Sequence, residues 1–550
     1  MKLPRRPARP ALGVSLLVLV LWLGAAGAYL LHTASQAGDA LAASRPALQS
    51  AQQALRAGDL AGASAALRTA APHVARARRL TSGPVWAVAA RLPVVGGNPA
   101  TLRAVTRTCD ELVRGVGQPA LRAVQLGAGS DTLELSRLRS TGLTLTAAAG
   151  RAQHSRNELA ATPTLLVAGP LIRAREQLLH QLDDKLLPAL HRSAAAASVA
   201  PDLLGASGPR RYFVALQNTA EARGTGGLLG VYAIVVAEAG KVRLERVGSD
   251  VDLVSRETAP VHLGEEYAFR YAEYAAGSDW LSGNLSPHFP YAARTWSTLW
   301  ERQNRQKLDG VLGADPAVLD ALLAASGPLP LPDGTVLGAG QAVAVTQQQA
   351  YVRYGTQTER KLFLAGLVGA TFERLSSADL PTLPMLRSLS GAATAGRLQV
   401  YSATPAEQLL LARAGLAGEL PRTSRPFLLT TVNNAFGNKL DYYLDQQVDY
   451  RLGSCNGDER PSTVTIRLTN RAPGGLSPYV TGAVEPTRTR PYPYAWHRVL
   501  LSVFTTSGSQ LTAATLNGRP VALRPSTERG HPVYDTYVDL PVGQEAVLAL

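Results

Sequence analysis

The segment RYFVALQNTAEARGTGGLLGVYAIVV, residues 211–236, is the clearest indication of the fold in the middle of this chain. It places two runs of apolar and β-branched residues on either side of a glycine-rich turn, which is typical of two adjacent strands. A third run of this kind, KVRLERVG, follows at residues 241–248. The sequence therefore predicts that a β-sheet starts near Arg211.

Helical patterns alternate with strands beyond this segment. An amphipathic helix is predicted over residues 290–303, and a short strand over residues 308–315 follows it. Asp315 is predicted to cap the next helix, with Pro316 at its first position. Strands that alternate with helices indicate an α/β domain with a mixed sheet, which we place at residues 206–435.

The chain upstream of this domain is rich in Ala, Leu, Gln and Arg at helical spacing. Gly58-Asp59 interrupts the pattern, and a helix-terminating glycine followed by an N-capping aspartate predicts a turn between two helices. We therefore predict an all-α stalk over residues 33–205.

A charge-free apolar run, LGVSLLVLVLWLGAAGAYLL, occupies residues 12–31 after a basic start. At 1.5 Å per residue it spans roughly 30 Å, the thickness of a bilayer core. This predicts a transmembrane helix in contact with membrane lipid, with residues 1–11 as a cytoplasmic tail and the bulk of the chain extracytoplasmic, a single-pass localisation in the cell membrane. A cleaved signal peptide is the alternative, because Ala26-Gly27-Ala28 resembles a cleavage site.

Residues 436–550 alternate apolar and polar side chains between regularly spaced turns, which predicts a β-sandwich. The predicted fold class is thus multidomain, with a transmembrane helix, an all-α stalk, an α/β mixed-sheet domain and a C-terminal β-sandwich. The join between the last two domains contains a group of polar residues that we expect to fix it: Asn434, Gly437, Asn438, Lys439 and Asp441.

Composition and charge narrow the function classes. The chain has 550 residues, of which 46% are hydrophobic, so it can bury a sizeable core. The net charge of +14 is concentrated upstream, since residues 12–205 hold 19 basic and 11 acidic side chains, whereas residues 206–435 hold 21 and 20. No basic stripe interleaved with aromatic residues is present, so we expect no nucleic-acid partner. Two cysteines, Cys109 and Cys455, exclude a disulfide scaffold, and whether they pair is left open.

The block around the glycine-rich turn resembles the bacterial domain-of-unknown-function 4012 family. The residues that carry the resemblance are Gln217, Asn218, Glu221, Arg223, Gly226 and Gly227. Further similar segments lie at residues 286–290, 308–332 and 434–451, so the resemblance covers about residues 205–455. It implies a protein of the cell envelope with a link to surface polysaccharide and no assigned activity.

The order of elements has a fainter similarity to the LytR–CpsA–Psr family. That resemblance implies a glycopolymer phosphotransferase acting on a polyprenyl-pyrophosphate-linked substrate, with Mg²⁺, acidic residues and an arginine-lined pocket. The positions that match are Arg223, Asp250 and Arg353, which become the catalytic candidates. The sequence departs from the pattern, because Gln217-Asn218 stands where an acid is expected. Mg²⁺ is therefore expected only under this alternative, and no other cofactor is predicted.

The residue types also define candidate ligand-binding positions. Gln217, Asn218, Glu221, Gly226 and Gly227 surround a turn whose backbone N–H groups can meet an anion. The structural alternative is that the glycines permit an unusual turn and that Glu221 pairs with an arginine. Asp250 and Asp252 are close enough in sequence to share a metal ion, and a solvated turn is the alternative.

Three hypotheses about function follow. The first is a binding role in cell-envelope or surface-polysaccharide organisation, with an anionic envelope glycopolymer or polyprenyl phosphate as partner. The second is the divergent phosphotransferase. The third, which follows from the β-domain alone, is a stalked adhesin or assembly scaffold. The sequence leaves open whether the protein is an enzyme. An enzyme requires its arginines and acids to converge, whereas a scaffold shows them scattered or mutually paired.

Overall fold

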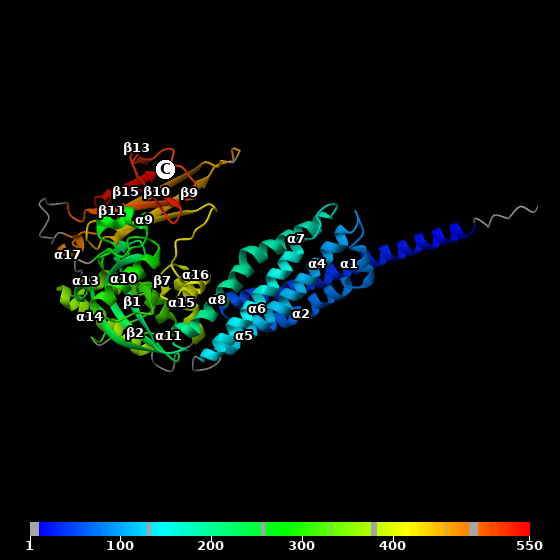
Figure 1. The fold of residues 1–550 in the computed structure, drawn as a ribbon, viewed down its shortest axis with the longest axis horizontal. Helices are drawn as coiled ribbons and strands as arrows, with labels where there is room; N and C mark the ends of the chain where they lie inside the picture. The colour runs from blue at the N-terminus through cyan, green and yellow to red at the C-terminus, as the bar shows by residue number, and fades with distance from the viewer. Residues whose placement is uncertain are drawn as a thin grey trace, which may run out of the picture. The chain divides into compact units, whose positions relative to one another are not determined.

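The computed structural model describes residues 10–128, 134–254, 259–331, 333–375, 382–457, 459–482 and 493–550. The chain divides into two compact units, Met1–Ala200 and Pro201–Leu550. Helices build the first unit, and β-sheets with covering helices build the second (Figure 1).

The first unit is a set of packed helices. Two π-helical turns, Glu111–Gly117 and Leu182–Leu186, interrupt them. The elements are α1 (Pro10–Ala57), α2 (Leu60–Thr81), α3 (Pro84–Ala89), α4 (Gly97–Asp110), α5 (Gln118–Ala128), α6 (Leu135–Ala160), α7 (Gly169–Gln181) and α8 (Leu187–Leu203).

The predicted turn between two helices at Gly58-Asp59 is confirmed. Gly58 adopts a positive φ of 76°, which ends α1 at little steric cost because glycine lacks a Cβ. The Asp59 side chain then accepts a hydrogen bond of 2.7 Å from the Gly62 N–H and caps α2. Small residues, Ala37 and Ala40 on α1 and Ala77 on α2, are buried where the two helices pack.

The prediction of a transmembrane helix over residues 12–31 is wrong. In the part of the chain that the structure describes, no helix is long and apolar enough to cross a membrane. The single-pass localisation inferred from that helix, with its cytoplasmic amino terminus and extracytoplasmic bulk, is overturned by the same finding. The side chains of residues 12–20 and the first nine residues of the predicted cytoplasmic tail lie outside the described residues.

Helix α1 extends well beyond the predicted span. The helix does not end at Leu31 but continues to Ala57, and this continuation packs against α2. The apolar run is therefore the start of a longer helix of the first unit.

A mixed five-stranded sheet forms the centre of the second unit, in the order β3-β2-β1-β4-β7. β1 pairs antiparallel with β2 and parallel with β4, as expected for a mixed sheet. The strands are β1 (Arg210–Arg223), β2 (Gly226–Glu238), β3 (Lys241–Ser249), β4 (Gly310–Ala314) and β7 (Leu398–Ser402). The sheet thus starts one residue from the position that the sequence predicts.

Both faces of this sheet are covered. Phe213 and Ala215 point to a core that includes Trp296 and Trp300 of α10 (Phe289–Asn304). The alternate residues of β1, Tyr212 and Val214, pack on the other face with side chains of α14 (Gln357–Leu375). Strand residues buried on both faces explain why β1 and β2 read as nearly continuous apolar runs.

Further short elements complete the α/β part. Asp315 caps α11, as predicted, by accepting a hydrogen bond of 2.9 Å from the Ala317 N–H. The other elements are α9 (Glu265–Tyr271), α11 (Pro316–Ser326), α12 (Ala342–Ala344), α13 (Ala350–Arg353), α15 (Thr382–Thr394), α16 (Pro405–Ala414), the pair β5 (Leu329–Pro330) and β6 (Val336–Leu337), and the helical turns Asp250–Asp252, Ala272–Tyr274 and Val345–Gln349.

Two antiparallel sheets form a β-sandwich at the carboxyl end of the described chain. Their orders are β13-β12-β16-β10-β9 and β14-β15-β11-β8, and Ile466 and Leu548 of one sheet share a core with Leu501 and Val538 of the other. The elements are β8 (Leu428–Asn434), β9 (Leu444–Leu452), β10 (Ser462–Asn470), β11 (His497–Thr505), β12 (Thr515–Leu516), β13 (Arg519–Pro520), β14 (Arg524–Glu528), β15 (His531–Leu540), β16 (Glu545–Ala549), α17 (Pro478–Thr481) and the turn Asp441–Tyr443. β8, which lies before the expected boundary at residue 436, belongs to this sandwich.

Both cysteines are free thiols in this structure. Cys109 lies on α4, and burial together with the neighbouring Asp110 raises the pKa of its thiol to about 11. Cys455 is exposed in the loop after β9. The pairing left open by the sequence does not form here.

Candidate functional site

A bulge near the end of β1 creates the candidate site. The pairing of β1 with β2 shifts register between Asn218 and Ala222, so the residues between them do not follow the ladder. Backbone N–H groups at the bulge find other partners: Ala220 donates to the Gln347 side chain at 2.6 Å, and Ala222, where the ladder resumes, donates to Asp441 Oδ2 at 3.0 Å. The bulge turns this end of β1 toward the polar segment that follows β8.

The predicted ligand-binding residues at the glycine-rich turn hold the turn together. Gln217 Oε1 accepts hydrogen bonds from Thr225 Oγ1 at 2.9 Å and from the Gly227 N–H at 3.1 Å. A Cβ at Gly227 would lie 2.2 Å from the Asn218 carbonyl oxygen, so only glycine fits. Gly226 adopts a φ of 141° in the same turn. The backbone N–H of Gly227 is therefore engaged within the fold.

Glu221 and Arg223 do come together, and Lys439 joins them. Glu221 forms an ion pair with Lys439 Nζ and a second with Arg223 Nη2 at 3.4 Å. Arg223 Nη1 also donates to the backbone carbonyl oxygens of Ala222 at 2.9 Å and Asn434 at 3.2 Å. We call Glu221, Arg223, Lys439, Asp441 and His497 the junction cluster, because it joins β1 to the β-sandwich.

The junction cluster is buried and its charges are compensated. Burial alone would lower the pKa of Lys439, but the adjacent Glu221 carboxylate outweighs this and raises it, so Lys439 is charged at neutral pH. The Lys439 ammonium also lies 5.4 Å from the centre of the Tyr479 ring. A buried glutamate that faces two cations is a structural clamp between distant parts of the chain.

Asp441 forms the second half of the junction cluster. Its Oδ1 lies 3.0 Å from His497 Nε2, and its Oδ2 accepts from the Asn434 side chain at 2.6 Å. Burial alone would raise the pKa of Asp441, but His497 and the hydrogen bonds from Ala222 and Asn434 lower it below the usual value. The folded protein therefore stabilises the ionised form of the Asp441 carboxyl group.

We expect the free energy of unfolding of Asp441→Asn to depend less on pH in the acid range than that of the wild type. A carboxyl group whose pKa is lowered by folding stabilises fully above its unfolded pKa near 4, and that contribution is lost as pH falls through the folded pKa. The wild-type free energy of unfolding, measured with urea between about pH 2.5 and 6, should therefore fall more steeply than that of the variant. At pH 6 the variant should be less stable by about 1–3 kcal/mol. Equal slopes for the two proteins would contradict this role of Asp441.

The other candidate positions lie elsewhere in the second unit. Asp250 faces Lys361 of α14 at 2.5 Å, and Asp252 accepts a hydrogen bond of 2.8 Å from the Ser249 N–H. Arg353 pairs with Asp333 at 3.2 Å with its side chain half exposed. Among the described residues, no hydrogen bond or ion pair joins Arg223, Asp250 and Arg353 to one another. Each of the three catalytic candidates thus pairs with a residue outside this set.

Asp250 and Asp252 do not fit a divalent cation. One carboxylate faces an ammonium group, and the other caps a helical turn, so each has a partner that competes with a metal ion. Within the described ranges, no group of three or more His, Cys, Asp and Glu side chains is arranged to hold a metal. We therefore derive no chemistry through Mg²⁺ at these positions.

A second buried polar network was missed by the sequence reasoning. Arg270 of α9 pairs with Glu528 at 3.1 Å and with Asp535 at 3.0 Å, and Glu528 also accepts from Tyr271 at 2.7 Å and from Ser286. Burial raises the pKa of Glu528, and Arg270 offsets part of this effect. We call these five residues the Arg270 network.

Sequence spacing held little signal for either network. Tyr271 and Glu528 are 257 positions apart, and Glu221 and Lys439 are 218 positions apart. Lys439 and Asp441 were expected at the join because polar residues cluster there, and this clustering was the usable signal. His497, Arg270 and Glu528 lie within ordinary strand and helix segments, and no pattern in the sequence marks them as members of a network.

Comparison with known proteins agrees with part of the sequence reading. A family model described as Protein of unknown function (DUF4012) matches residues 207–351, which include β1, β2 and the bulge. The match ends before the segment at 434–451, and the fainter similarity to the LytR–CpsA–Psr family is not found. No curated protein and no solved structure matches this chain. Over residues 207–351, this chain is therefore similar to the DUF4012 family of proteins of unknown function.

Proposed function

We propose that this protein acts by binding an anionic glycopolymer, in the organisation of surface polysaccharide. Two features of the charged residues support the proposal. The cations of the candidate site, Arg223 and Lys439, already pair with Glu221 or donate to backbone carbonyl oxygens. Few of their N–H groups are therefore free to bind a pyrophosphate. The surplus of positive charge lies on the helical unit, where most arginines are exposed. A glycosyl-phosphate transferase would need Arg223, Asp250 and Arg353 free to meet its substrate, whereas each of them pairs with another side chain, and this favours binding over transfer.

The observation that carries the proposal is the basic face of α2. This helix contains four arginines and no acidic residue, and one of them, Arg78, pairs with Asp110 at 2.7 Å. Arg68, Arg76 and Arg79 are exposed and fall within about 80° of one another around the helix axis. The opposite side of α2 buries small apolar residues against the neighbouring helices.

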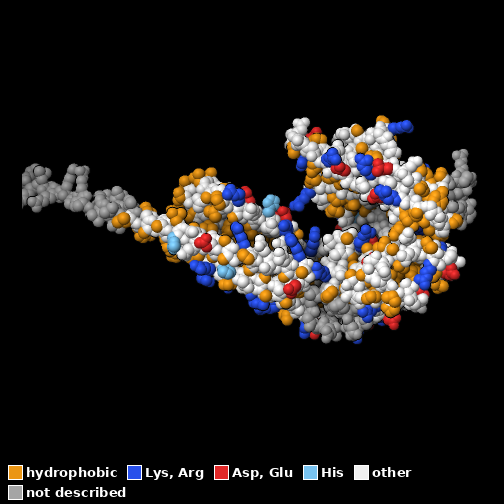
Figure 2. Space-filling view, turned by 180° about the vertical axis from the view of Figure 1, so that it is seen from behind, with side chains coloured by type: hydrophobic (Ala, Val, Ile, Leu, Met, Phe, Trp, Pro, Cys, Tyr) orange, Lys and Arg blue, Asp and Glu red, His pale blue; other side chains and the backbone are white. Residues whose placement is uncertain are grey.

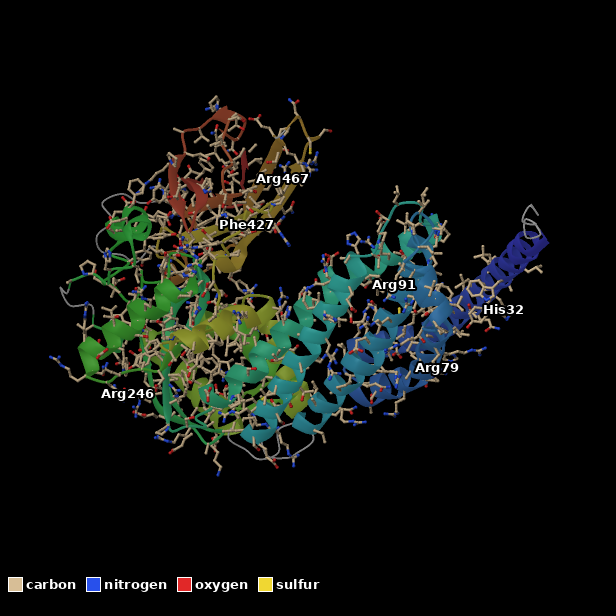
Figure 3. All side chains as sticks on the ribbon, turned by 45° about the vertical axis from the view of Figure 1, so that its right-hand side comes forward. His32, Arg79, Arg91, Arg246, Phe427 and Arg467 are labelled. Atoms are coloured by element: carbon tan, nitrogen blue, oxygen red, sulfur yellow. The ribbon has the colours of Figure 1, made fainter. Side chains whose placement is uncertain are left out.

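Such a face suits a flexible polyanion. Guanidinium groups make forked hydrogen bonds to carboxylate or phosphate oxygens, and three of them in a row along a helix match a repeating anionic chain. Figure 2 shows further Lys and Arg side chains along the helical unit on the face drawn there. Arg79 is labelled on this unit in Figure 3.

The test is binding of the full chain to polygalacturonate, with neutral dextran of similar length as control, measured by titration calorimetry. We expect binding to polygalacturonate that weakens as salt rises, and no binding to dextran. Arg76→Gln with Arg79→Gln should weaken the affinity about tenfold, because two charge-assisted hydrogen-bonding groups are lost.

The matched control removes two exposed arginines from the second unit. Arg413→Gln with Arg519→Gln changes the net charge by the same amount but leaves α2 intact. Its affinity should stay within about twofold of wild type, since only distant screened charges change. An equal loss of affinity in both double variants would show that binding depends on net charge alone and not on α2. If the wild-type chain does not bind polygalacturonate, the proposal is wrong.

A further inference from the structure

Two turns at one end of the helical unit expose a group of aliphatic side chains. The first turn joins α3 to α4 and the second joins α6 to α7, although they are about 70 positions apart in sequence. Val94 and Leu166 are 70% and 64% exposed. We call the exposed aliphatic residues of these turns the turn patch: Leu92, Val94, Val95, Leu165 and Leu166.

The fold holds the two turns together. Asn98 donates from its side-chain nitrogen to the Leu166 carbonyl oxygen at 3.2 Å and accepts from the Ala168 N–H at 2.7 Å. Thr101 Oγ1 donates to the Pro163 carbonyl oxygen at 3.4 Å. Side-chain hydrogen bonds therefore hold the two turns of the turn patch in a fixed position relative to each other.

Backbone conformation adds a second observation. Val94 has a φ of 72° and Leu166 a φ of 56°, the left-handed region that residues other than glycine rarely adopt. For a β-branched residue such as Val94 this conformation is strained. Glycine would relieve the strain, yet both positions carry large aliphatic side chains at the outer ends of their turns. Strained residues of this kind concentrate at functional surfaces.

The segments that form the two turns carry basic side chains, and Glu158 and Glu176 stand just outside the second of them. Residues 82–106 and 159–175, which contain both turns, hold no acidic side chain. Arg91 and Arg173 are exposed within them. Figure 2 shows hydrophobic side chains gathered at the end of the helical unit nearest the start of α1, and Figure 3 labels Arg91 on this unit.

We propose that the turn patch docks on the surface of an anionic lipid bilayer. Aliphatic side chains at protruding turns enter the boundary between headgroups and acyl chains, while adjacent arginines meet the lipid phosphates. A protein partner is less well matched, because interface centres are enriched in aromatic residues and the turn patch is purely aliphatic. The contact is peripheral, is made by two turns, and requires no membrane-spanning helix.

The test is co-sedimentation of the full chain with vesicles of phosphatidylglycerol and phosphatidylcholine, and with vesicles of phosphatidylcholine alone. Val94→Gly with Leu166→Gly removes two exposed aliphatic side chains of the turn patch at positions whose φ suits glycine, so the fold is preserved. We expect the partition coefficient of this variant on the mixed vesicles to fall at least about tenfold. Arg91→Gln with Arg173→Gln should weaken binding by about tenfold on the mixed vesicles and little on the neutral ones.

Leu143→Gly on α6 supplies the matched control. Leu143 is as exposed as Val94, at 70%, but lies outside the two turns. Its partition coefficient should stay within about twofold of wild type. Every variant retains α1, so the exposed apolar residues of that helix contribute equally throughout.

Three outcomes would overturn the proposal. The wild-type chain could fail to bind the mixed vesicles, or the Val94/Leu166 variant could bind them as well as wild type. The turn patch could instead join two copies, which sedimentation velocity would reveal as a concentration-dependent dimer that the Val94/Leu166 variant loses while vesicle binding is unchanged. Loss of polygalacturonate binding in the α2 variant is a separate result, because it involves different residues.

Discussion

Replacing Glu221 by Ala is expected to lower the free energy of unfolding of the second unit by about 3–5 kcal/mol. Glu221 is 5% exposed and compensates both Lys439 and Arg223, so its removal leaves two cations in a buried site. Taking a charge out of water without a partner is the costliest single change that this site allows. Urea unfolding followed by tryptophan fluorescence measures it, since Trp280, Trp296, Trp300 and Trp496 lie in this unit.

Two further variants test whether the loss of stability comes from the burial of the Glu221 ion pairs or from the removal of any negative charge. Glu545 pairs with Arg467 at 3.3 Å on the exposed surface of the sandwich, so Glu545→Ala should cost at most about 1 kcal/mol. Adding Lys439→Met to Glu221→Ala should recover part of the loss, because one unpaired charge is removed. If Glu221→Ala behaved like Glu545→Ala, the junction cluster would not be the clamp described here.

The second large effect is expected for Arg270→Met, again a loss of about 3–5 kcal/mol. Arg270 is 3% exposed and is the cation shared by Glu528 and Asp535. Methionine preserves the apolar contact with the Phe504 ring, which the guanidinium covers at 5.3 Å, but leaves two carboxylates without a cation. Thermal unfolding of the full chain at neutral pH should show the transition of the second unit at a lower temperature.

Arg524→Met is the matched control for Arg270→Met. Arg524 also joins the α9 region to β14, through Glu273, but this ion pair is largely exposed. Its loss should change stability by at most about 1 kcal/mol. Lowering the pH should narrow the difference between Arg270→Met and wild type, because the pKa of Glu528 is raised and a protonated carboxyl needs no cation. A difference independent of pH would point to lost packing rather than unpaired charge.

Local signals in the sequence predicted the secondary structure well. The apolar runs around the glycine-rich turn predicted β1 and β2, Asp315 predicted the start of α11, and Gly58-Asp59 predicted the turn between α1 and α2. These predictions succeed because side-chain periodicity and capping act over a few residues. The resemblance to the DUF4012 family is confirmed over residues 207–351, which include the block around the glycine-rich turn.

The candidate site was predicted less well. The sequence left both a ligand-binding and a structural role open for Gln217, Gly226 and Gly227, and the structure uses them to build the turn. Arg223, Asp250 and Arg353 were proposed from the fainter resemblance to the LytR–CpsA–Psr family, and each of them pairs with a different residue. The transmembrane helix was inferred from the absence of charge in one run, whereas the continuation of α1 and its packing depend on α2.

Local patterns along the chain were enough to predict many of the strands, helices and caps, and they showed that positive charge gathers upstream. Which charges meet depends on how distant segments fold together. Glu221 and Lys439 are 218 positions apart, and their pairing exists because the β1 bulge and the segment after β8 fold against each other. Periodicity is a local property of the chain, whereas burial and ion pairing depend on contacts between distant segments, so they emerge only when the chain is folded.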